Sequence, residues 1–157
     1  MSDTRTATPK SVLDEHRSSA GLLLALLGHE AMRRLRAVHT AHDLKPRQFQ
    51  ILGLLHDHGG LAQRELMQEM DIDPSILVTL LNPLEVAGIV ARERDPADRR
   101  RHIVTMTTDG AETLRAIESA LDKADDDLFA ALSPAERDQL QRLLTKVADS
   151  GACGEAC

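Results

Sequence analysis

The sequence concentrates its arginines in one short segment, RERDPADRRRHIVTMT, at residues 92–107. Guanidinium groups donate several hydrogen bonds and bind phosphates and the edges of bases, so such a cluster is typical of a nucleic-acid site. The segment contains the arginines Arg92, Arg94, Arg99, Arg100 and Arg101 and the acids Glu93, Asp95 and Asp98. Because the formal net charge of the whole chain is −6, we expect one confined basic face rather than indiscriminate coating of nucleic acid.

The arginine segment falls where the hydrophobic period changes to that of β-strands. IVARER at 89–94 and RHIVTM at 101–106 are rich in β-forming residues, and the Asp95-Pro96 pair between them is typical of a turn. The pattern predicts an antiparallel hairpin with Arg99 and Arg100 at or beside its tip. Asp98 is close enough in sequence to pair with an arginine and hold it extended.

Two short helices are predicted ahead of this hairpin. Pro46 suits the first turn of PRQFQILGLLHDH, and Gly59-Gly60 ends that helix. AQRELMQEM at 62–70 forms the next helix. Its inward-facing residues are Leu66, Met67 and Met70.

A third helix is predicted within DIDPSILVTLLNPLEVAG, residues 71–88. Asp73 is a good N-cap, Pro74 suits the first helical position, and Gly88 falls where a left-handed glycine closes a helix. Pro83 lies inside the helix and removes one backbone hydrogen bond, so we expect a kink or a local opening there.

A short helix, a tight turn and a second helix, followed directly by a hairpin, form a winged helix-turn-helix. An α-helix fits the major groove of duplex DNA, and arginines on a hairpin tip can reach a neighbouring minor groove. On the second helix of the motif, the face predicted to meet base edges carries Ser75, Ile76, Thr79 and Asn82. The flanking helix N-termini, where phosphates are favoured, carry Arg47, Gln63 and Arg64.

Long helices are predicted on either side of this motif. Residues 11–44 follow the spacing of a buried apolar stripe. Thr107 or Thr108 is predicted to cap a second long helix, which runs to about Leu132. Ser133 to Glu136 forms a capping box that opens a last helix at 134–149. The turn at 22–27 is apolar on every side, so we expect it to be covered, as between two subunits. Residues 1–10 and 150–157 are predicted to be disordered tails.

Composition favours helices packed on helices. The chain has 157 residues with two phenylalanines and no tryptophan or tyrosine, so its core must consist of Leu, Ile, Val, Ala and Met. The polar N-terminus predicts no signal peptide, and the longest apolar run, Gly21–Gly28, is too short to span a membrane. We therefore expect a mainly α protein of the cytoplasm that does not contact membrane.

Four segments in this order resemble the MarR family of bacterial transcription regulators (multiple antibiotic resistance regulators). DPADRRRHIVTMTTDG at 95–110 is similar to the family's wing signature, with Asp98, Arg100 and Thr107 in place. DPSILVTLLNPLEVAGIV at 73–90 resembles its recognition helix. The resemblance runs from about residue 20 to 148 and includes two further segments, QREL at 63–66 and LSPAERDQLQRLL at 132–144.

The resemblance implies a homodimer whose first and last helices interleave. Residues 11–44 and 108–149 would then be the dimerisation region, and residues 45–107 the winged helix-turn-helix DNA-binding domain. A dimer of this kind binds a pseudo-palindromic operator in double-stranded DNA with half-sites about 10 bp apart. The resemblance also implies that the protein represses a gene, usually an adjacent one, and that a small-molecule effector releases this repression.

The family's effector pocket lies between the dimer helices and the DNA-binding lobe. Candidate residues for an anionic effector are His16, Arg17, Arg36 and His39. Besides Pro83 inside the recognition helix, two positions depart from the family pattern. Ala62 replaces a Ser or Thr N-cap, which weakens that helix start, and Asp71 replaces the glycine of the turn, where Asp tolerates the left-handed conformation.

Histidines provide an alternative, a zinc-responsive regulator of the same fold. His39 and His42 are spaced i, i+3, and His56-Asp57-His58 follows a helix end. These positions are equally typical of exposed helix ends, so we predict neither a metal nor another cofactor. Cys153 and Cys157 lie in the tail and could bind metal or form a disulfide, although a flexible tail explains them as well.

An enzyme and a protein-interaction module are the remaining alternatives. The sequence contains no Gly-rich phosphate loop, no Ser/His/Asp order and no paired carboxylates placed by independent elements, so we predict that the protein is not an enzyme. A winged helix used only for protein contacts would leave Arg99–Arg101 without a partner unless that partner were acidic.

Overall fold

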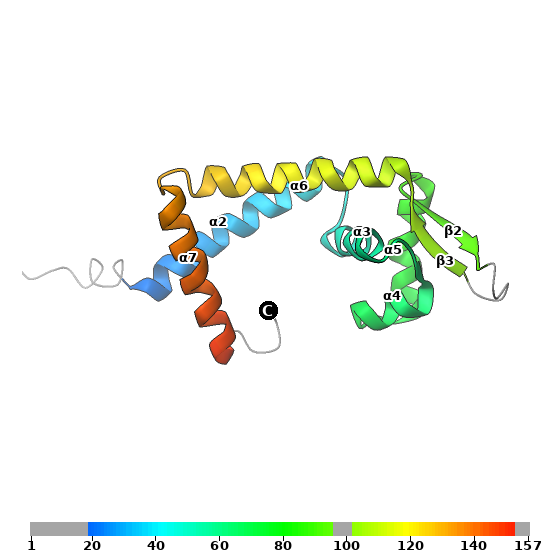
Figure 1. The fold of residues 1–157 in the computed structure, drawn as a ribbon, viewed down its shortest axis with the longest axis horizontal. Helices are drawn as coiled ribbons and strands as arrows, with labels where there is room; N and C mark the ends of the chain where they lie inside the picture. Colours follow the sequence, from blue (N-terminus) through cyan, green and yellow to red (C-terminus); the bar gives the residue numbers. More distant parts are fainter. Residues whose placement is uncertain (1–18, 96–101, 153–157) are drawn as a thin grey trace, which may run out of the picture.

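The computed structural model describes residues 19–95 and 102–152. Two long helices, α2 (Ala20–Ala41) and α6 (Thr108–Leu128), pack side by side and connect two differently built parts of the molecule. In Figure 1, α6 runs along the top, with a lobe of short helices and strands at one end and α7 (Pro134–Val147) at the other. No helix of the described ranges is long and apolar enough to cross a membrane.

The lobe contains three helices and a small antiparallel sheet. Its helices are α3 (Pro46–His58), α4 (Gln63–Met70) and α5 (Pro74–Val86). Its strands are β1 (Leu61–Ala62), β2 (Val90–Arg94) and β3 (His102–Met106), in the order β1-β3-β2. The helix-turn-helix, the hairpin and the mainly α fold class are confirmed.

Strand β1 was not expected from the sequence. Gly59 and Gly60, with φ of 71° and 139°, end α3 and turn the chain into β1. Leu61 then pairs with Val104 of β3. A two-residue strand carries no periodic signal, and it exists only because β3 lies alongside.

The core of the lobe is aliphatic, as the composition predicts. Leu66 and Met70 of α4 are buried and Met67 packs partly against them, which confirms their inward orientation. The buried cluster also extends into α6 through Leu114 and Ile117, beyond the domain boundary expected at residue 107. The other buried members are Leu44, Ile51, Leu52, Leu55, Leu77, Leu80, Leu81, Leu84, Val90 and Val104.

Three helices end in the same way, and two of these ends carry aspartate instead of glycine. Asp43 after α2 and Asp71 after α4 both have φ of 48°, and Gly88 after α5 has φ of 71°. In each case the next amide bonds back to the carbonyl five residues earlier, as Leu44 does to His39 at 3.0 Å. Asp71 therefore preserves the turn, as predicted, whereas the helix expected over 11–44 ends at Ala41 because Asp43 closes it.

The C-terminal helices are also shorter than expected. Helix α6 ends at Leu128, before the predicted Leu132, and α7 ends at Val147, where a wider π-helical turn η1 (Ala148–Ala152) follows. The capping box is confirmed, since the Ser133 amide and hydroxyl both donate to Glu136 Oε2, at 2.8 and 2.7 Å. These hydrogen bonds lower the pKa of the Glu136 carboxyl below its usual value.

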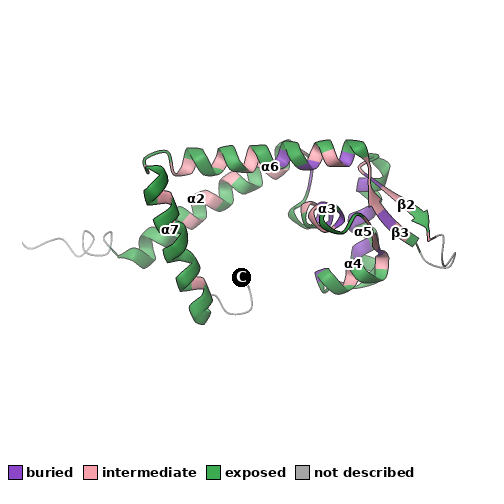
Figure 2. Ribbon diagram, in the orientation of Figure 1, coloured by how far each residue is buried: buried purple, intermediate pink, exposed green. Residues whose placement is uncertain are grey.

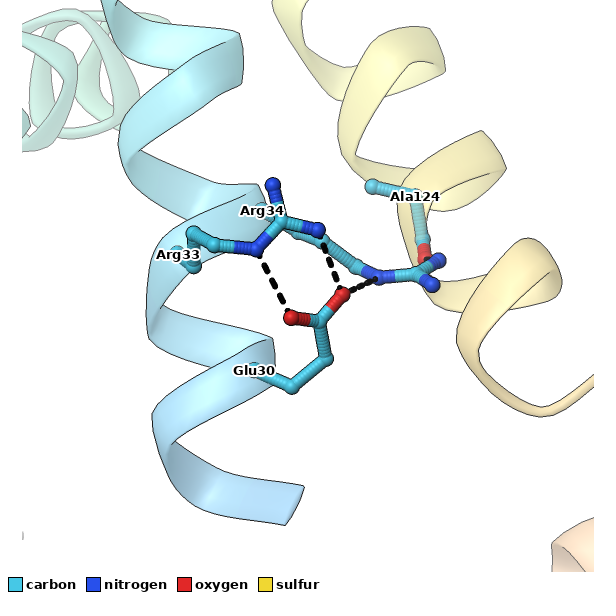
Figure 3. A network of polar contacts seen from close by, with 4 residues as sticks. All are labelled: Glu30, Arg33, Arg34 and Ala124. Atoms are coloured by element: carbon cyan, nitrogen blue, oxygen red, sulfur yellow. Dashed lines mark hydrogen bonds and ion pairs between the residues drawn. The ribbon is translucent and has the colours of Figure 1, made fainter. Parts of the chain in front are cut away.

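A charged network joins α2 to α6 (Figure 3). The Glu30 carboxylate accepts two hydrogen bonds from Arg33 and one from Arg34, at 2.7, 2.7 and 2.8 Å. Arg34 also donates to the Ala124 carbonyl of α6 at 3.3 Å. Hydrogen bonds from Arg33 and then Arg34 lower the pKa of Glu30 to about 2, so the network keeps its charge throughout the physiological pH range.

The start of α6 is fastened to the end of α5 and the start of β2. Thr107 caps α6, since its Oγ1 accepts from the Gly110 amide at 3.0 Å. The same oxygen lies 2.6 Å from the Gly88 carbonyl and 3.0 Å from that of Ile89. Gly110 is packed so closely that an added Cβ would lie 2.1 Å from the Ile89 carbonyl oxygen and 2.7 Å from Met106 Cγ. Only glycine fits this approach.

We predict that Gly110→Ala destabilises the protein, because the methyl group meets a backbone oxygen that cannot move without shifting β2. Overpacking of this kind costs about 1–3 kcal/mol in the free energy of unfolding. Urea denaturation at one fixed protein concentration measures it. Gly53→Ala is the matched control: nothing lies within 4 Å of its added Cβ, so this change should raise stability by up to about 1 kcal/mol. Equal midpoints for Gly110→Ala and wild type would contradict the packing argument.

Candidate DNA-binding surface

Helix α5 presents a polar face directly opposite its buried one. Four leucines of α5 enter the core, and the helical period places Ser75, Thr79 and Asn82 on the other side, where they are exposed. Ile76 also points outward, with 43% of its surface exposed, so it does not pack into the core. The four residues predicted to meet base edges are therefore accessible together.

Hydrogen bonds within α5 determine which donors and acceptors this face presents to solvent. The Thr79 hydroxyl donates to the Ser75 carbonyl at 2.9 Å, which leaves its oxygen as an acceptor toward solvent. Val78 and Val86 were not predicted as part of this surface, and they are 42% and 91% exposed on the same side of α5. Both valines lie outside the stripe of four buried leucines, so the helical period alone could have found them.

Arg92 of the wing points toward α5. Its Nη2 donates to Asn82 Oδ1 at 2.7 Å, and its Nε lies 3.1 Å from Glu85 Oε2 as an ion pair without hydrogen-bond alignment. Only 19% of the Arg92 side chain is exposed. The sequence predicts Arg92 as a DNA contact and gives no signal for Glu85, because the pairing depends on how β2 packs against α5.

Of the remaining wing residues predicted to contact DNA, only Arg94 lies within the described residues. Arg94 lies two residues after Arg92 on the same face of β2, opposite His102 of β3, and is exposed. Its contact with DNA stays a prediction. The tip residues Asp98, Arg99, Arg100 and Arg101 lie outside the described residues, so their roles stay predictions as well.

Two arginines expected to flank the recognition helix meet at one hollow. Arg47 from the first turn of α3 and Arg64 from the first turn of α4 line a depression of about 600 Å³ together with Ile76 of α5. Both arginines are exposed, and no hydrogen bond or ion pair within residues 19–95 and 102–152 engages them. Gln63, the first residue of α4, is half-buried beside Arg64.

The weak points expected around the motif are supported by neighbouring side chains. Ala62 has no acceptor for the helix amides, but its own amide donates to Glu65 Oε2 at 2.7 Å, which braces the start of α4. Helix α5 continues through Pro83, and the side-chain amide nitrogen of Gln48, Nε2, donates to the Leu80 carbonyl in the turn before it at 3.1 Å. Gln48 is 4% exposed, and sequence reasoning did not mark it.

The candidate effector residues Arg36 and His39 line a second hollow, of about 460 Å³. It lies where the end of α2, the start of α3 and Pro83 of α5 meet, and Lys45 adds a second cation to its lining. The His39 ring packs edge-on against Phe49 at 5.6 Å, and its Nδ1 is buried with no hydrogen-bond partner among the described residues. His16 and Arg17 lie outside those residues.

The histidines proposed as an alternative zinc site do not converge in the described part of the chain. His56 Nδ1 lies 3.3 Å from Asp57 Oδ1, and both side chains are exposed. Within residues 19–95 and 102–152, no three His, Cys, Asp or Glu side chains are placed to share a metal ion. Cys153 and Cys157 fall outside these ranges.

The arrangement defines a class of protein. A helix-turn-helix of α4 and α5, followed by the β2–β3 hairpin, is a winged helix-turn-helix, in which the second helix is the one that enters the major groove. Helix α5, the hairpin beside it and helices α3 and α4, which carry Arg47 and Arg64, all belong to this lobe (Figure 1).

Comparison with known proteins gives the family. A family model described as the MarR family matches residues 42–101. A protein named for transcriptional regulation of the hcr operon of Thauera aromatica is 37% identical over 112 residues, which cover 71% of this chain and 68% of the relative. The transcriptional repressor NicR of Pseudomonas putida is 32% identical over 131 residues, or 79% and 83% of the two chains. A mutant of S. aureus MepR bound to an oligodeoxyribonucleotide superposes with a TM-score of 0.69 at 27% identity, covering 84% of this chain and 97% of that one.

The chain belongs to the MarR family and is a transcriptional regulator of the winged helix-turn-helix class. The resemblance predicted from the wing, the recognition helix and the flanking segments is thereby confirmed. The expectation that the protein is not an enzyme is confirmed by the same relatives, which are named as transcriptional regulators.

Proposed function

We propose that this regulator is a homodimeric repressor that binds a pseudo-palindromic operator and is released by a small anionic effector. The observation that carries the proposal is the exposed face of α5, flanked on one side by the wing and on the other by the exposed Arg47 and Arg64. Phosphates bound by the arginines would set the register in which α5 meets base edges. The names of two relatives support this: NicR is a repressor, and the MepR mutant was bound to an oligonucleotide. Because the proposed operator is double-stranded DNA, we also propose that the protein acts in the cytoplasm.

The proposed dimer rests on the long helices outside the lobe. Helix α2 has no buried residue, although it is rich in leucine, and α7 has none either (Figure 2). Leaving this much aliphatic surface in water is unfavourable, and a second copy of α2 and α7 would cover it. The large apolar residues exposed on these helices are Leu22, Leu23, Leu24, Leu26, Leu27, Met32, Leu35, Leu143, Leu144 and Val147.

The proposed effector site is the hollow beside Pro83. Arg36 and Lys45 give the hollow two positive charges against the single negative charge of Asp43, and their N–H groups are hydrogen-bond donors that suit a carboxylate. The hollow joins α2 of the proposed dimer region to the turn of α5 that contains Pro83. An effector that binds better to one position of α5 than to another shifts the population toward that position, and operator affinity changes with it.

The first prediction concerns the operator. Arg100→Ala should weaken binding 10-fold or more in a gel-shift titration, because a charge-assisted contact is lost. Arg64→Ala should weaken binding to all sequences alike and reduce the salt slope by about one charge. Lys123→Ala on α6 removes the same charge away from the lobe and is the matched control. A flat dependence on salt would instead favour the protein-contact alternative.

The second prediction concerns the dimer. Leu23→Glu and Leu27→Glu should shift sedimentation from dimer to monomer, because each places a charge in the proposed interface. Val86→Glu alters a still more exposed apolar residue on α5 and should leave the dimer intact. Deletion of residues 1–10 should leave it intact as well. A wild-type chain that sediments as a stable monomer would refute the interleaved helices.

The third prediction concerns the effector. A panel of small aromatic and aliphatic carboxylates should contain compounds that lower operator affinity, and Arg36→Ala should abolish this response without weakening binding in their absence. Arg33→Ala is the control, since Arg33 lies one turn earlier on α2, where it pairs with Glu30 outside the hollow. Release that persists in Arg36→Ala would place the effector elsewhere.

A further inference from the structure

The recognition helix and the wing are joined by one polar cluster, formed by Asn82, Glu85 and Arg92. Arg92 leaves β2, reaches Asn82 at 2.7 Å and lies 3.1 Å from a Glu85 carboxylate oxygen. Asn82 and Glu85 are exposed and one turn apart on α5, whereas the Arg92 side chain is only 19% exposed. The two α5 side chains thus contact neighbouring nitrogens, Nη2 and Nε, of one guanidinium that the strand holds in place.

This contact determines how the Asn82 amide is turned. Guanidinium has donors only, so the atom of the amide that faces Arg92 must be the oxygen. The Nδ2 group is attached to the same carbon and points away from Arg92, and no group in the described ranges accepts a hydrogen bond from it. The exposed face of α5 therefore offers two N–H donors at this position, with the acceptor turned toward the wing.

An asparagine that is free to turn usually pairs with adenine, using its oxygen for N6 and its nitrogen for N7. That geometry needs both atoms of the amide on the same base edge. Turning the Asn82 oxygen from the wing toward a base would break its 2.7 Å hydrogen bond with Arg92. The fixed amide instead suits an edge with acceptors only, and in the major groove guanine presents N7 and O6 together.

We propose that Asn82 is a specificity-determining residue that selects guanine at one position of each half-site. Arg92 and Glu85 are positioning residues that act through it rather than DNA contacts. The assignment rests on the proposed function, since it requires α5 to lie in the major groove of an operator. It goes beyond that function by naming the base and the device that selects it.

Selection of bound sequences from a randomised duplex library tests the assignment. Wild-type protein should prefer guanine about tenfold at one position in each half-site, as one good base contact gives. Arg92→Met frees the amide, so adenine should rise to at least the level of guanine at that position only. Asn82→Asp replaces the donors by a carboxylate that still pairs with Arg92, and the preference should change to cytosine, whose N4 is a donor.

Control variants separate this inference from the proposed function. Arg64→Ala should lower affinity without changing any base preference, and a thermal melt shows whether Arg92→Met remains folded. Asn82→Asp keeps the contact with Arg92, so its result does not depend on that variant. If wild type selects a sequence but Asn82→Ala and Arg92→Met leave every position unchanged, the assignment of Asn82 is wrong and operator binding stands. If wild type selects no sequence, the proposed operator binding and the inference both fail.

Discussion

The close approach of α6 to the Ile89 carbonyl is the constraint on which the rest of the molecule depends. Gly110 allows it, and Thr107 bonds across it to Gly88 and Ile89. One junction thereby fixes the short link between the recognition helix and β2 and the direction in which α6 leaves the lobe. Because α6 also packs along α2, the orientation of the DNA-binding lobe relative to the long helices follows from this contact.

Side-chain hydrogen bonds on two sides of α5 further fix the position of the recognition helix within the lobe. On the wing side Arg92 pairs with Asn82 and Glu85, and on the other side Gln48 binds the Leu80 carbonyl next to Pro83. The buried face of α5 is entirely leucine, and apolar packing alone does not fix how far the helix slides or turns. The directional hydrogen bonds of these polar groups fix that position. The hollow at Arg36 and His39 adjoins the Gln48 side and connects α2 to the same turn of α5.

Much of this arrangement is predictable from local patterns. The caps at Thr107 and Ser133, the left-handed turn at Asp71 and the outward face of α5 follow from residue type and helical period, and the structure confirms each. Strand β1 and the end of α2 at Asp43 were missed. Strand β1 forms only because β3, which is distant in the sequence, pairs with it. The end of α2 has Asp43 where a glycine is usual, and hydrogen bonds of its neighbours hold this aspartate in the left-handed conformation.

The sequence by itself determined the order of the elements, the aliphatic core and the family, because periodicity, capping and charge are properties of short segments. It also placed Arg47, Arg64 and Ile76 near one surface, which the structure brings together. Only the tertiary structure decided which way Arg92 turns and hence which atom of Asn82 faces outward. That outcome depends on the packing of β2 against α5, a contact between segments whose relative position no local pattern encodes.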